Sequence, residues 1–218
     1  MLNTLELATG PAPSAAVIWL HGLGADGNDF APIVGELDLP PTAIRFVFPH
    51  APAMPVTING GYVMPAWYDI LGTDLNRRED ESGVRASQQA VEALVAREGE
   101  RGIAPNRIVL AGFSQGGAIA LQTALRQSRA LAGVMALSTY VPLAATLPTE
   151  RNAASNTVPI LMAHGTHDPV IPLAMAKRSR DLLRSLGYDV QWHEYPMEHS
   201  VCPEEIAAIG AFLRRVLA

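Results

Sequence analysis

Cysteine is almost missing from this sequence of 218 residues, because Cys202 is its only one. No disulfide can form within the chain, and nothing indicates an oxidising compartment. A lone thiol can still serve as a nucleophile. We interpret Cys202 as an inert thiol, because a complete set of serine, aspartate and histidine for nucleophilic catalysis occurs elsewhere in the chain.

Extended basic runs and long apolar runs are missing too. The formal net charge is −5, and the sequence has no concentrated positive patch of the kind that nucleic-acid binding requires. No segment approaches the length of a membrane span, and the first residues have neither the basic start nor the apolar core of a signal peptide. We therefore expect a cytoplasmic protein with no membrane span and no nucleic-acid partner.

Internal repeats, low-complexity tracts and linkers that would separate domains are also absent. Hydrophobic residues make up 49% of the chain and charged residues 17%, which suits a sheet covered on both faces. At this length the chain can bury one substantial core. We expect a single domain over residues 1–218.

Strand-like and helical segments alternate along the chain. This order predicts right-handed crossovers and a mostly parallel, doubly wound α/β sheet with helices on both faces. An edge strand near residues 3–8 is expected to pair antiparallel. The strand-like runs lie near 15–20, 44–48, 107–112, 131–138, 158–163 and 188–195, and the helical patterns near 28–38, 83–100, 114–126, 172–187 and 203–217.

The strongest functional signal is the run Gly112-Phe113-Ser114-Gln115-Gly116, which lies between a strand-like and a helical segment. Gly-x-Ser-x-Gly alone recurs by chance, but strand, sharp turn and helix with a serine at the apex is typical of a nucleophile elbow. Glycines remove side chains where the backbone is crowded. A serine that merely caps the helix would need no glycine on both sides, so we predict that Ser114 is a nucleophile.

A serine hydroxyl needs a histidine base, which in this arrangement follows the acid along the chain. His199 follows the strand-like run 188–195 in a loop, where an open α/β sheet places its site residues. We therefore predict that His199 is the base. His193 is the main alternative, although it lies within the strand-like run; His164 and His167 precede or crowd the acid.

The acid is predicted to be Asp168, which lies in the loop after the buried strand-like run 158–163. Asp181 falls in a helical pattern and Asp189 opens a strand, so neither is presented at the right end of a strand. Asp168 could instead cap a helix before Pro169, and the two roles are compatible.

The oxyanion of the tetrahedral intermediate needs two N–H donors. Gln115, directly after the predicted nucleophile, is expected to supply one. Leu23 is expected to supply the other, because it lies between glycines after the strand-like run 15–20. A glycine-rich turn could also cradle a phosphate, but no Gly-Lys-Ser/Thr follows it.

Taken together, these motifs resemble the phospholipase/carboxylesterase family, an α/β-hydrolase group that contains small bacterial carboxylesterases and acyl-protein thioesterases. The resemblance covers the chain from about residue 15 to its end. It implies an α/β-hydrolase fold without a large separate lid domain, the same triad and oxyanion donors, and a possible homodimer. The motifs are His21-Gly22-Leu23-Gly24, Val47-Phe48-Pro49 with Ala51-Pro52, Trp67-Tyr68-Asp69, Gly112 to Gly117, Asp168-Pro169-Val170-Ile171-Pro172 and Met197-Glu198-His199.

Two features differ from the eukaryotic thioesterases of this family. Tyr68 stands in the Trp-x-Asp motif where Phe is frequent, and the N-terminus has no cysteine for lipidation. Both favour a bacterial carboxylesterase.

The segment 49–82 has no regular pattern and is longer than ordinary connections, which indicates function or disorder. Its many apolar and aromatic residues favour a functional groove beside the elbow, together with the irregular stretch 139–157. Trp67 could instead only pack the loop onto the sheet, and whether the loop moves as a lid is open. The residues expected to bind substrate are Met64, Trp67, Ile70, Leu71 and Val170.

We therefore expect a serine carboxylesterase that cleaves esters of short to medium acyl chains through an acyl-enzyme on Ser114. The partner is a small acyl ester or thioester, and the chemistry needs no cofactor or metal. An acyl-protein or small-molecule thioesterase, or a lysophospholipase, would use the same triad. A non-catalytic binding protein on a hydrolase scaffold is a remote alternative, because such proteins usually lack a triad member.

Overall fold

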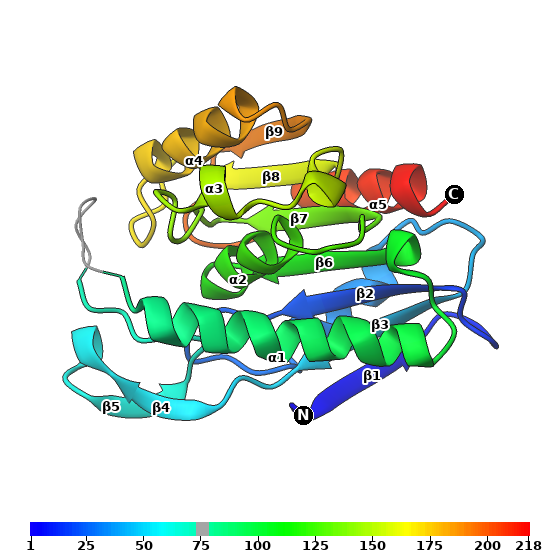
Figure 1. Cartoon of the computed structure of the whole chain (residues 1–218), viewed down its shortest axis with the longest axis horizontal. Helices are drawn as coiled ribbons and strands as arrows, with labels where there is room; N and C mark the ends of the chain where they lie inside the picture. The colour runs from blue at the N-terminus through cyan, green and yellow to red at the C-terminus, as the bar shows by residue number, and fades with distance from the viewer. Residues whose placement is uncertain (73–78) are drawn as a thin grey trace.

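The computed structural model describes residues 1–72 and 79–218, which form a twisted sheet with helices on both faces (Figure 1). Within these ranges the main sheet has seven strands, and every neighbouring pair is parallel except β1 with β3. This confirms the expected fold and the antiparallel edge strand. In spatial order the strands are β1 (Thr4–Ala8), β3 (Ile44–Pro49), β2 (Ala15–Leu20), β6 (Ile108–Phe113), β7 (Gly133–Leu137), β8 (Ile160–Gly165) and β9 (Val190–Tyr195).

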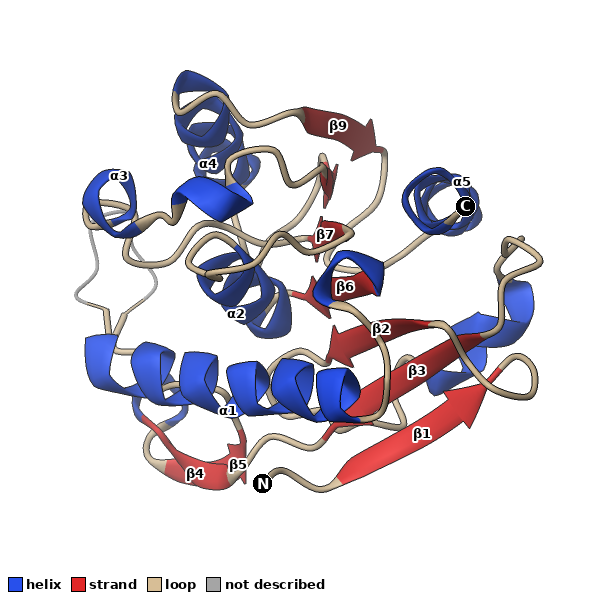
Figure 2. Ribbon diagram, turned by 45° about the vertical axis from the view of Figure 1, so that its right-hand side comes forward, coloured by secondary structure: helices blue, strands red, loops and turns tan. Residues whose placement is uncertain are grey.

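The helices divide between the two faces of the sheet (Figure 2). The first face is covered by α1 (Glu81–Glu100), α2 (Gln115–Ala124) and α4 (Leu173–Ser185), and the second by α5 (Pro203–Leu217). Alternate side chains of β2 enter the two cores: Ile18 and Leu20 lie in the first, Val17 and Trp19 in the second. This is the period of two that a strand imposes. Among the described residues, none of the helices has the length and apolar character needed to cross a lipid bilayer.

Three expectations about local structure need correction. The helical pattern at 28–38 forms only a short 3-10 helix (Ala31–Glu36), with Pro32 in its first turn and Gly35 within it, both poor helix formers. The segment 49–82 is not irregular throughout: β4 (Ala53–Val56) and β5 (Tyr62–Pro65) pair antiparallel. Residues 73–78 of that segment lie outside the described residues. The stretch 139–157 contains a short helix, α3 (Leu147–Glu150), and a 3-10 turn (Ala153–Ser155).

The turn of the β4–β5 hairpin explains why its strands are hard to foresee. Gly60 and Gly61 both have positive φ, 65° and 80°, which lets the chain reverse tightly. Pro55 lies inside β4. It is tolerated because each strand of a two-stranded sheet has one unpaired edge, where no backbone N–H donor is needed. Tyr62 and Val63 are well exposed, so the strands lack the alternation of a half-buried strand.

One carboxyl group is buried where α5 begins. Glu205 is fully buried, and neither of its carboxyl oxygens has a hydrogen-bond partner among the described residues. Burial disfavours the charged form and raises the pKa of Glu205 to about 8. The side chain is therefore protonated at neutral pH in the folded protein.

We predict that this group makes the protein less stable as pH rises. Unfolded Glu205 releases its proton near its ordinary pKa of 4.5, whereas the folded protein retains it up to about pH 8. Between these values the folded state binds more protons, so the free energy of unfolding falls with rising pH, by at most about 1.4 kcal/mol per unit from this group. Urea denaturation of Glu205→Gln at pH 5 and pH 8 should show a smaller fall than the wild type.

Glu204→Gln is the matched control, because this neighbouring glutamate is exposed. It should keep the wild-type pH dependence. Equal falls in the wild type and in Glu205→Gln would contradict the assignment.

Candidate active site

Ser114 lies at the sharp turn between β6 and α2, with φ 54° and ψ −122°. A positive φ is strained for a residue with a side chain, and the surrounding structure must hold it. The Ser114 N–H donates to the Leu137 carbonyl oxygen (2.8 Å), and the Thr139 hydroxyl donates to the Ser114 carbonyl oxygen (2.6 Å). The Ser114 hydroxyl makes no capping hydrogen bond to α2. Its strained conformation therefore does not serve helix capping.

The glycines around Ser114 are required by close backbone contacts. A Cβ on Gly112 would lie 2.3 Å from the backbone of Gly116, and a Cβ on Gly116 would lie 2.4 Å from the Leu20 carbonyl oxygen. Such distances are far below van der Waals contact. The first turn of α2 therefore packs directly against the carboxyl end of β2, and the loop that follows β2 comes to lie beside Ser114.

Asp168 lies in the turn after β8, and its carboxylate divides its two oxygens between two tasks. Oδ1 accepts from the backbone N–H groups of Val170 and Ile171, both at 2.8 Å. Oδ2 lies 2.7 Å from Nδ1 of His199. The Asp168 side chain has no exposed surface. The N-cap of α4 is Pro172, so Asp168 stabilises this turn and does not cap the helix.

His199 reaches Asp168 because its loop crosses the end of β8. A Cβ on Gly165 would lie 2.3 Å from the Glu198 carbonyl oxygen, so only glycine allows this crossing. The His199 ring also packs on Phe113, with ring centroids 4.7 Å apart. Since Phe113 directly precedes Ser114, the three predicted triad residues lie at one edge of the sheet.

The other histidines after residue 160 occupy different surroundings. His193 lies within β9, where its Nε2 is 2.8 Å from Gln191 Nε2 and its ring stacks on Tyr195. His167 is exposed. His164 is fully buried behind the acid: its Nε2 lies 2.9 Å from the Ile171 carbonyl oxygen and 3.4 Å from Asp168 Oδ2. Burial lowers the pKa of His164, so its ring is neutral.

The backbone N–H groups of Leu23 and Gln115 donate no hydrogen bond to any described residue. The loop that carries Leu23 is held by the buried imidazole of His21. Nδ1 of His21 donates to the Gly22 carbonyl oxygen (2.7 Å), and Nε2 accepts from the Ala51 N–H (3.1 Å). Burial lowers the pKa of His21, which keeps this ring neutral. His21 thus holds this loop without using the Leu23 N–H.

A cavity of about 100 Å³ is lined by Ser114 together with Leu23 and Gln115. Two larger cavities of the described chain do not include Ser114. Of the five residues expected to bind substrate, Ile70 and Val170 line the cavity at Ser114. Its full lining is Leu23, Ile58, Tyr68, Ile70, Ser114, Gln115, Tyr140, Val170 and Ile171.

The expectation for Met64, Trp67 and Leu71 is not supported, because none of them lines this cavity. Met64 lies on β5, where its sulfur accepts from Asn59 (3.4 Å), and Leu71 is partly exposed at the surface. Apolar character alone did not distinguish lining residues from packing residues.

Trp67 is a buried structural residue. Its indole N–H donates to the His21 carbonyl oxygen (2.9 Å), and its backbone N–H donates to Gln115 Oε1 (2.8 Å). The Ser87 hydroxyl donates to the Trp67 carbonyl oxygen. Trp67 therefore fastens its loop to the ends of β2 and α2 and to α1. A lone sequence cannot show this, because the partners are distant in the chain.

The Gln115 side chain was missed by the sequence analysis, which considered only its N–H. Its Nε2 donates to the Tyr68 carbonyl oxygen (2.6 Å) while Oε1 holds Trp67. The residue whose N–H is expected to receive the oxyanion thus also positions the loop that brings Tyr68 to the cavity lining.

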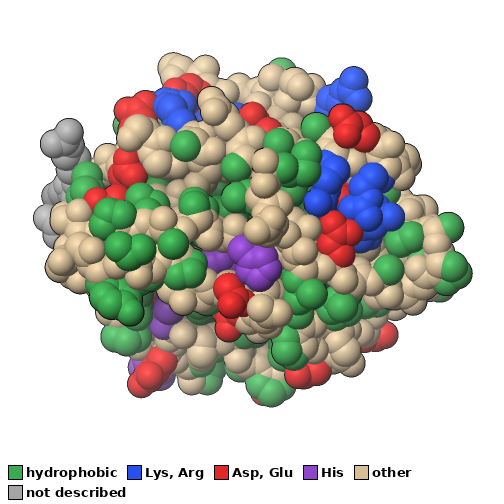
Figure 3. All heavy atoms as spheres, turned by 90° about the horizontal axis from the view of Figure 1, so that it is seen from below, with side chains coloured by type: hydrophobic (Ala, Val, Ile, Leu, Met, Phe, Trp, Pro, Cys, Tyr) green, Lys and Arg blue, Asp and Glu red, His purple; other side chains and the backbone are tan. Residues whose placement is uncertain are grey.

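On the face of the molecule shown in Figure 3, a histidine side chain lies near the centre, beside an Asp or Glu side chain and with hydrophobic side chains nearby. Most Lys and Arg side chains on this face lie on the right of the view, with others at its upper left, and they are mixed with Asp and Glu. Within the described residues, no group of three or more His, Cys, Asp or Glu is arranged to hold a metal ion.

Comparison with known proteins gives consistent matches over nearly the whole chain. The model of the phospholipase/carboxylesterase family matches residues 7–217. Acyl-protein thioesterase 1 of Gibberella zeae is 41% identical over 94% of this chain and 91% of its own length. Acyl-protein thioesterase 1 of Mycosarcoma maydis is 40% identical over 100% and 98%. The crystal structure of Arabidopsis thaliana SOBER1 superposes with a TM-score of 0.89 at 30% identity, covering 94% of this chain and 99% of that chain.

These relatives are eukaryotic, so they do not support the expectation of a bacterial carboxylesterase. That expectation depended partly on Tyr68 in place of Phe. The two residues differ by one hydroxyl, which here pairs with Tyr140 (2.7 Å) and therefore has a local structural use.

The geometry predicts different outcomes for two histidines. His199→Ala removes the group bonded to Asp168 and should lower kcat by about a millionfold, as loss of a triad base does. His193→Ala, the matched control, should change kcat by less than about tenfold. Asp168→Asn should lower kcat by about ten-thousandfold. Steady-state rates on p-nitrophenyl acetate test all three variants. If His193→Ala were inactive and His199→Ala active, the assignment of His199 as the base would be wrong.

Trp67 is predicted to affect the stability of the protein and not its preference for acyl chain length. Trp67→Phe leaves the His21 carbonyl without its indole donor and should lower the free energy of unfolding by about 2 kcal/mol. Losses in kcat/KM should be equal for acetyl and octanoyl esters. Trp192→Phe is the control, since its indole donates to a glutamate at the surface (2.9 Å); it should cost less than about 1 kcal/mol. A loss confined to the octanoyl ester would place Trp67 in the acyl site after all.

Proposed function

Because the chain belongs to the phospholipase/carboxylesterase family of α/β-hydrolases and is a serine hydrolase, we propose that it cleaves carboxylic esters and thioesters of short to medium acyl chains through an acyl-enzyme on Ser114. The observation that carries this proposal is the 2.7 Å contact between His199 Nδ1 and Asp168 Oδ2 at the same edge of the sheet as Ser114. A carboxylate on Nδ1 leaves Nε2 as the base of the imidazole.

The proposed reaction begins when Ser114 Oγ attacks the carbonyl carbon. His199 Nε2 takes the hydroxyl proton, and Asp168 stabilises the imidazolium that forms. The N–H groups of Leu23 and Gln115 donate to the oxyanion of the tetrahedral intermediate. His199 then gives its proton to the leaving alcohol or thiol. A water molecule repeats the sequence on the acyl-enzyme and releases the acid and free Ser114.

An acyl substrate is supported by the composition of the cavity wall. Apart from Ser114 and Gln115, the wall consists of aliphatic and tyrosine side chains. Ile58 and Val170 line the cavity and are also exposed, 39% and 60% respectively, so apolar surface continues to its mouth. Apolar walls with few polar groups are typical of sites for acyl chains. The small volume of about 100 Å³ favours short to medium chains over long ones.

Thioester hydrolysis is a second activity that the comparisons favour. The relatives at 40–41% identity are acyl-protein thioesterases that match nearly their whole length to this chain. The triad chemistry accommodates both bonds, because thiolates are good leaving groups and need less help from the acid. An acylated protein is therefore a candidate substrate beside small acyl esters. The homodimer and the cytoplasmic location stay predictions.

We expect Ser114→Ala to lower kcat by about a millionfold, because the hydroxyl forms the covalent intermediate. The fold should be unchanged, since the elbow depends on its glycines more than on this side chain. Rates on p-nitrophenyl acetate and on an acyl thioester of equal length, together with circular dichroism, measure both effects. A fluorophosphonate should label the wild type and not the variant.

Ser128→Ala is the matched control, because this serine is exposed, and it should keep wild-type rates and labelling. A folded Ser114→Ala protein that retained a tenth of the wild-type rate would exclude Ser114 as the nucleophile.

A further inference from the structure

A second cavity shares the lining residue Tyr140 with the cavity at Ser114. Tyr140 lines both the cavity of about 100 Å³ that contains Ser114 and a separate cavity of about 270 Å³. Among the residues that the structure describes, no other is shared by the two linings. Tyr140 therefore borders both the small space at the nucleophile and a space nearly three times as large.

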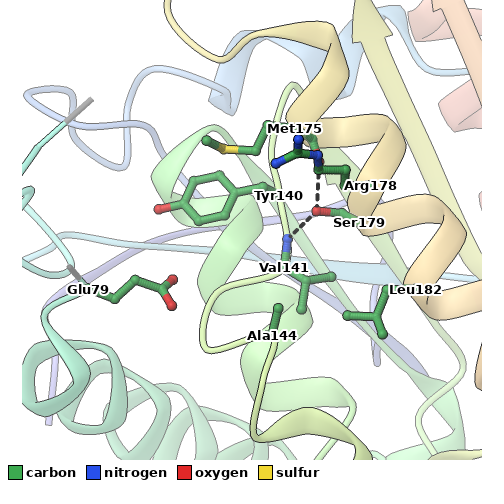
Figure 4. Close-up of a pocket in the computed structure, with 8 residues that line it drawn as sticks. All are labelled: Glu79, Tyr140, Val141, Ala144, Met175, Arg178, Ser179 and Leu182. Carbon is green, nitrogen blue, oxygen red and sulfur yellow. Dashed lines mark hydrogen bonds between the residues drawn. The ribbon is translucent and has the colours of Figure 1, made fainter. Parts of the chain in front are cut away.

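The larger cavity is built by three parts of the chain (Figure 4). The loop after β7 contributes Tyr140, Val141 and Ala144, and α4 contributes Met175, Arg178, Ser179 and Leu182. Glu79 closes a third side. Most of these side chains are apolar. None of the proposed triad residues Ser114, Asp168 and His199 lines this cavity, so the proposed reaction does not use this space.

Its polar groups are mostly engaged within the protein. The Glu79 carboxylate accepts from the Leu143 N–H (3.0 and 3.1 Å), and the Ser179 hydroxyl accepts from the Val141 N–H (2.9 Å). The Arg178 guanidinium also lines this cavity, so its apolar wall is the part formed by Tyr140, Val141, Ala144, Met175 and Leu182, and that part favours a hydrocarbon.

Tyr140 is held in place as a wall. It is 6% exposed, and its hydroxyl lies 2.7 Å from that of Tyr68, which is 4% exposed and lines the cavity at Ser114. The hydrogen bonds of Val141 and Leu143 fix the backbone on the carboxyl side of Tyr140. A buried ring with a paired hydroxyl and an anchored backbone does not move aside without loss of these contacts.

We propose that Tyr140 is a specificity-determining residue that limits acyl chain length by separating the cavity at Ser114 from the apolar cavity behind it. The occupant of the joined space, once the ring is removed, is the distal part of a long, uncharged acyl chain. This inference rests on the proposed acyl-enzyme reaction and adds to it the residue that ends the acyl site.

Removing the ring should raise activity selectively toward long chains. Each methylene that enters an apolar site adds about fourfold to the binding of the chain. In Tyr140→Ala, several methylenes of a dodecanoyl chain gain access to the second cavity, whereas a butanoyl chain ends before it. The ratio of kcat/KM for p-nitrophenyl dodecanoate to that for the butanoate should rise by at least about tenfold over the wild type.

Three further variants make the test specific. Tyr140→Leu retains more core volume and should raise the ratio in the same direction, which provides a test if Tyr140→Ala does not fold by circular dichroism. Tyr140→Phe keeps the ring and loses only the hydroxyl, so it should keep a ratio near that of the wild type. Tyr140→Ala with Ala144→Phe fills the second cavity again and should return the ratio toward the wild-type value.

An unchanged ratio in the folded Ala or Leu variant would overturn the proposal. So would a rise that persists in the filled double variant, because the gain would then arise outside this cavity, or an equal rise in Tyr140→Phe. The proposed reaction at Ser114 is tested separately: the wild type should hydrolyse the butanoate, and Ser114→Ala should not. If both esters are hydrolysed at Ser114 and only the ratio fails to move, the inference about Tyr140 alone is wrong.

Discussion

The arrangement of the site depends on one close backbone contact, between the first turn of α2 and the carboxyl end of β2. A Cβ at Gly116 would lie 2.4 Å from the Leu20 carbonyl oxygen, and one at Gly112 would meet the backbone of Gly116. No L side chain fits there. Without this contact, α2 would stand away from the sheet, and the loop that carries Leu23 would not lie in the same cavity as Ser114.

Around this contact, hydrogen bonds hold the loops of the site in place without using the backbone N–H groups that are expected to bind the oxyanion. Asp168 uses one oxygen to hold its turn and the other for His199. His21 holds the loop of Leu23 by two hydrogen bonds without using the Leu23 N–H. The Gln115 side chain holds the loop of Trp67, while its backbone N–H has no acceptor among the described residues. Such preorganisation allows donors to meet developing charge without reorganising.

Much of this could be predicted from the sequence because the signals are local. The alternation of strands and helices, the glycines around Ser114, and a carboxylate and a histidine after successive strands each follow from short segments. The structure brings Asp168 and His199 within hydrogen-bond distance, as the sequence analysis expects for such a pair. The groove was predicted less well. Trp67 is buried by partners that are distant in the chain, and the hydroxyl of Tyr140 pairs with that of Tyr68 across 72 positions. Neither contact leaves a periodic or motif signal.

Mass spectrometry of a quenched reaction tests most directly whether the acyl group passes through Ser114. Wild-type protein mixed with p-nitrophenyl butanoate is quenched in acid during turnover, digested and searched for a butanoyl adduct. We predict that the adduct lies on Ser114 and that His199→Ala accumulates none on the same time scale. An adduct on Cys202 or on any other side chain of the active wild type, with Ser114 unmodified, would contradict it.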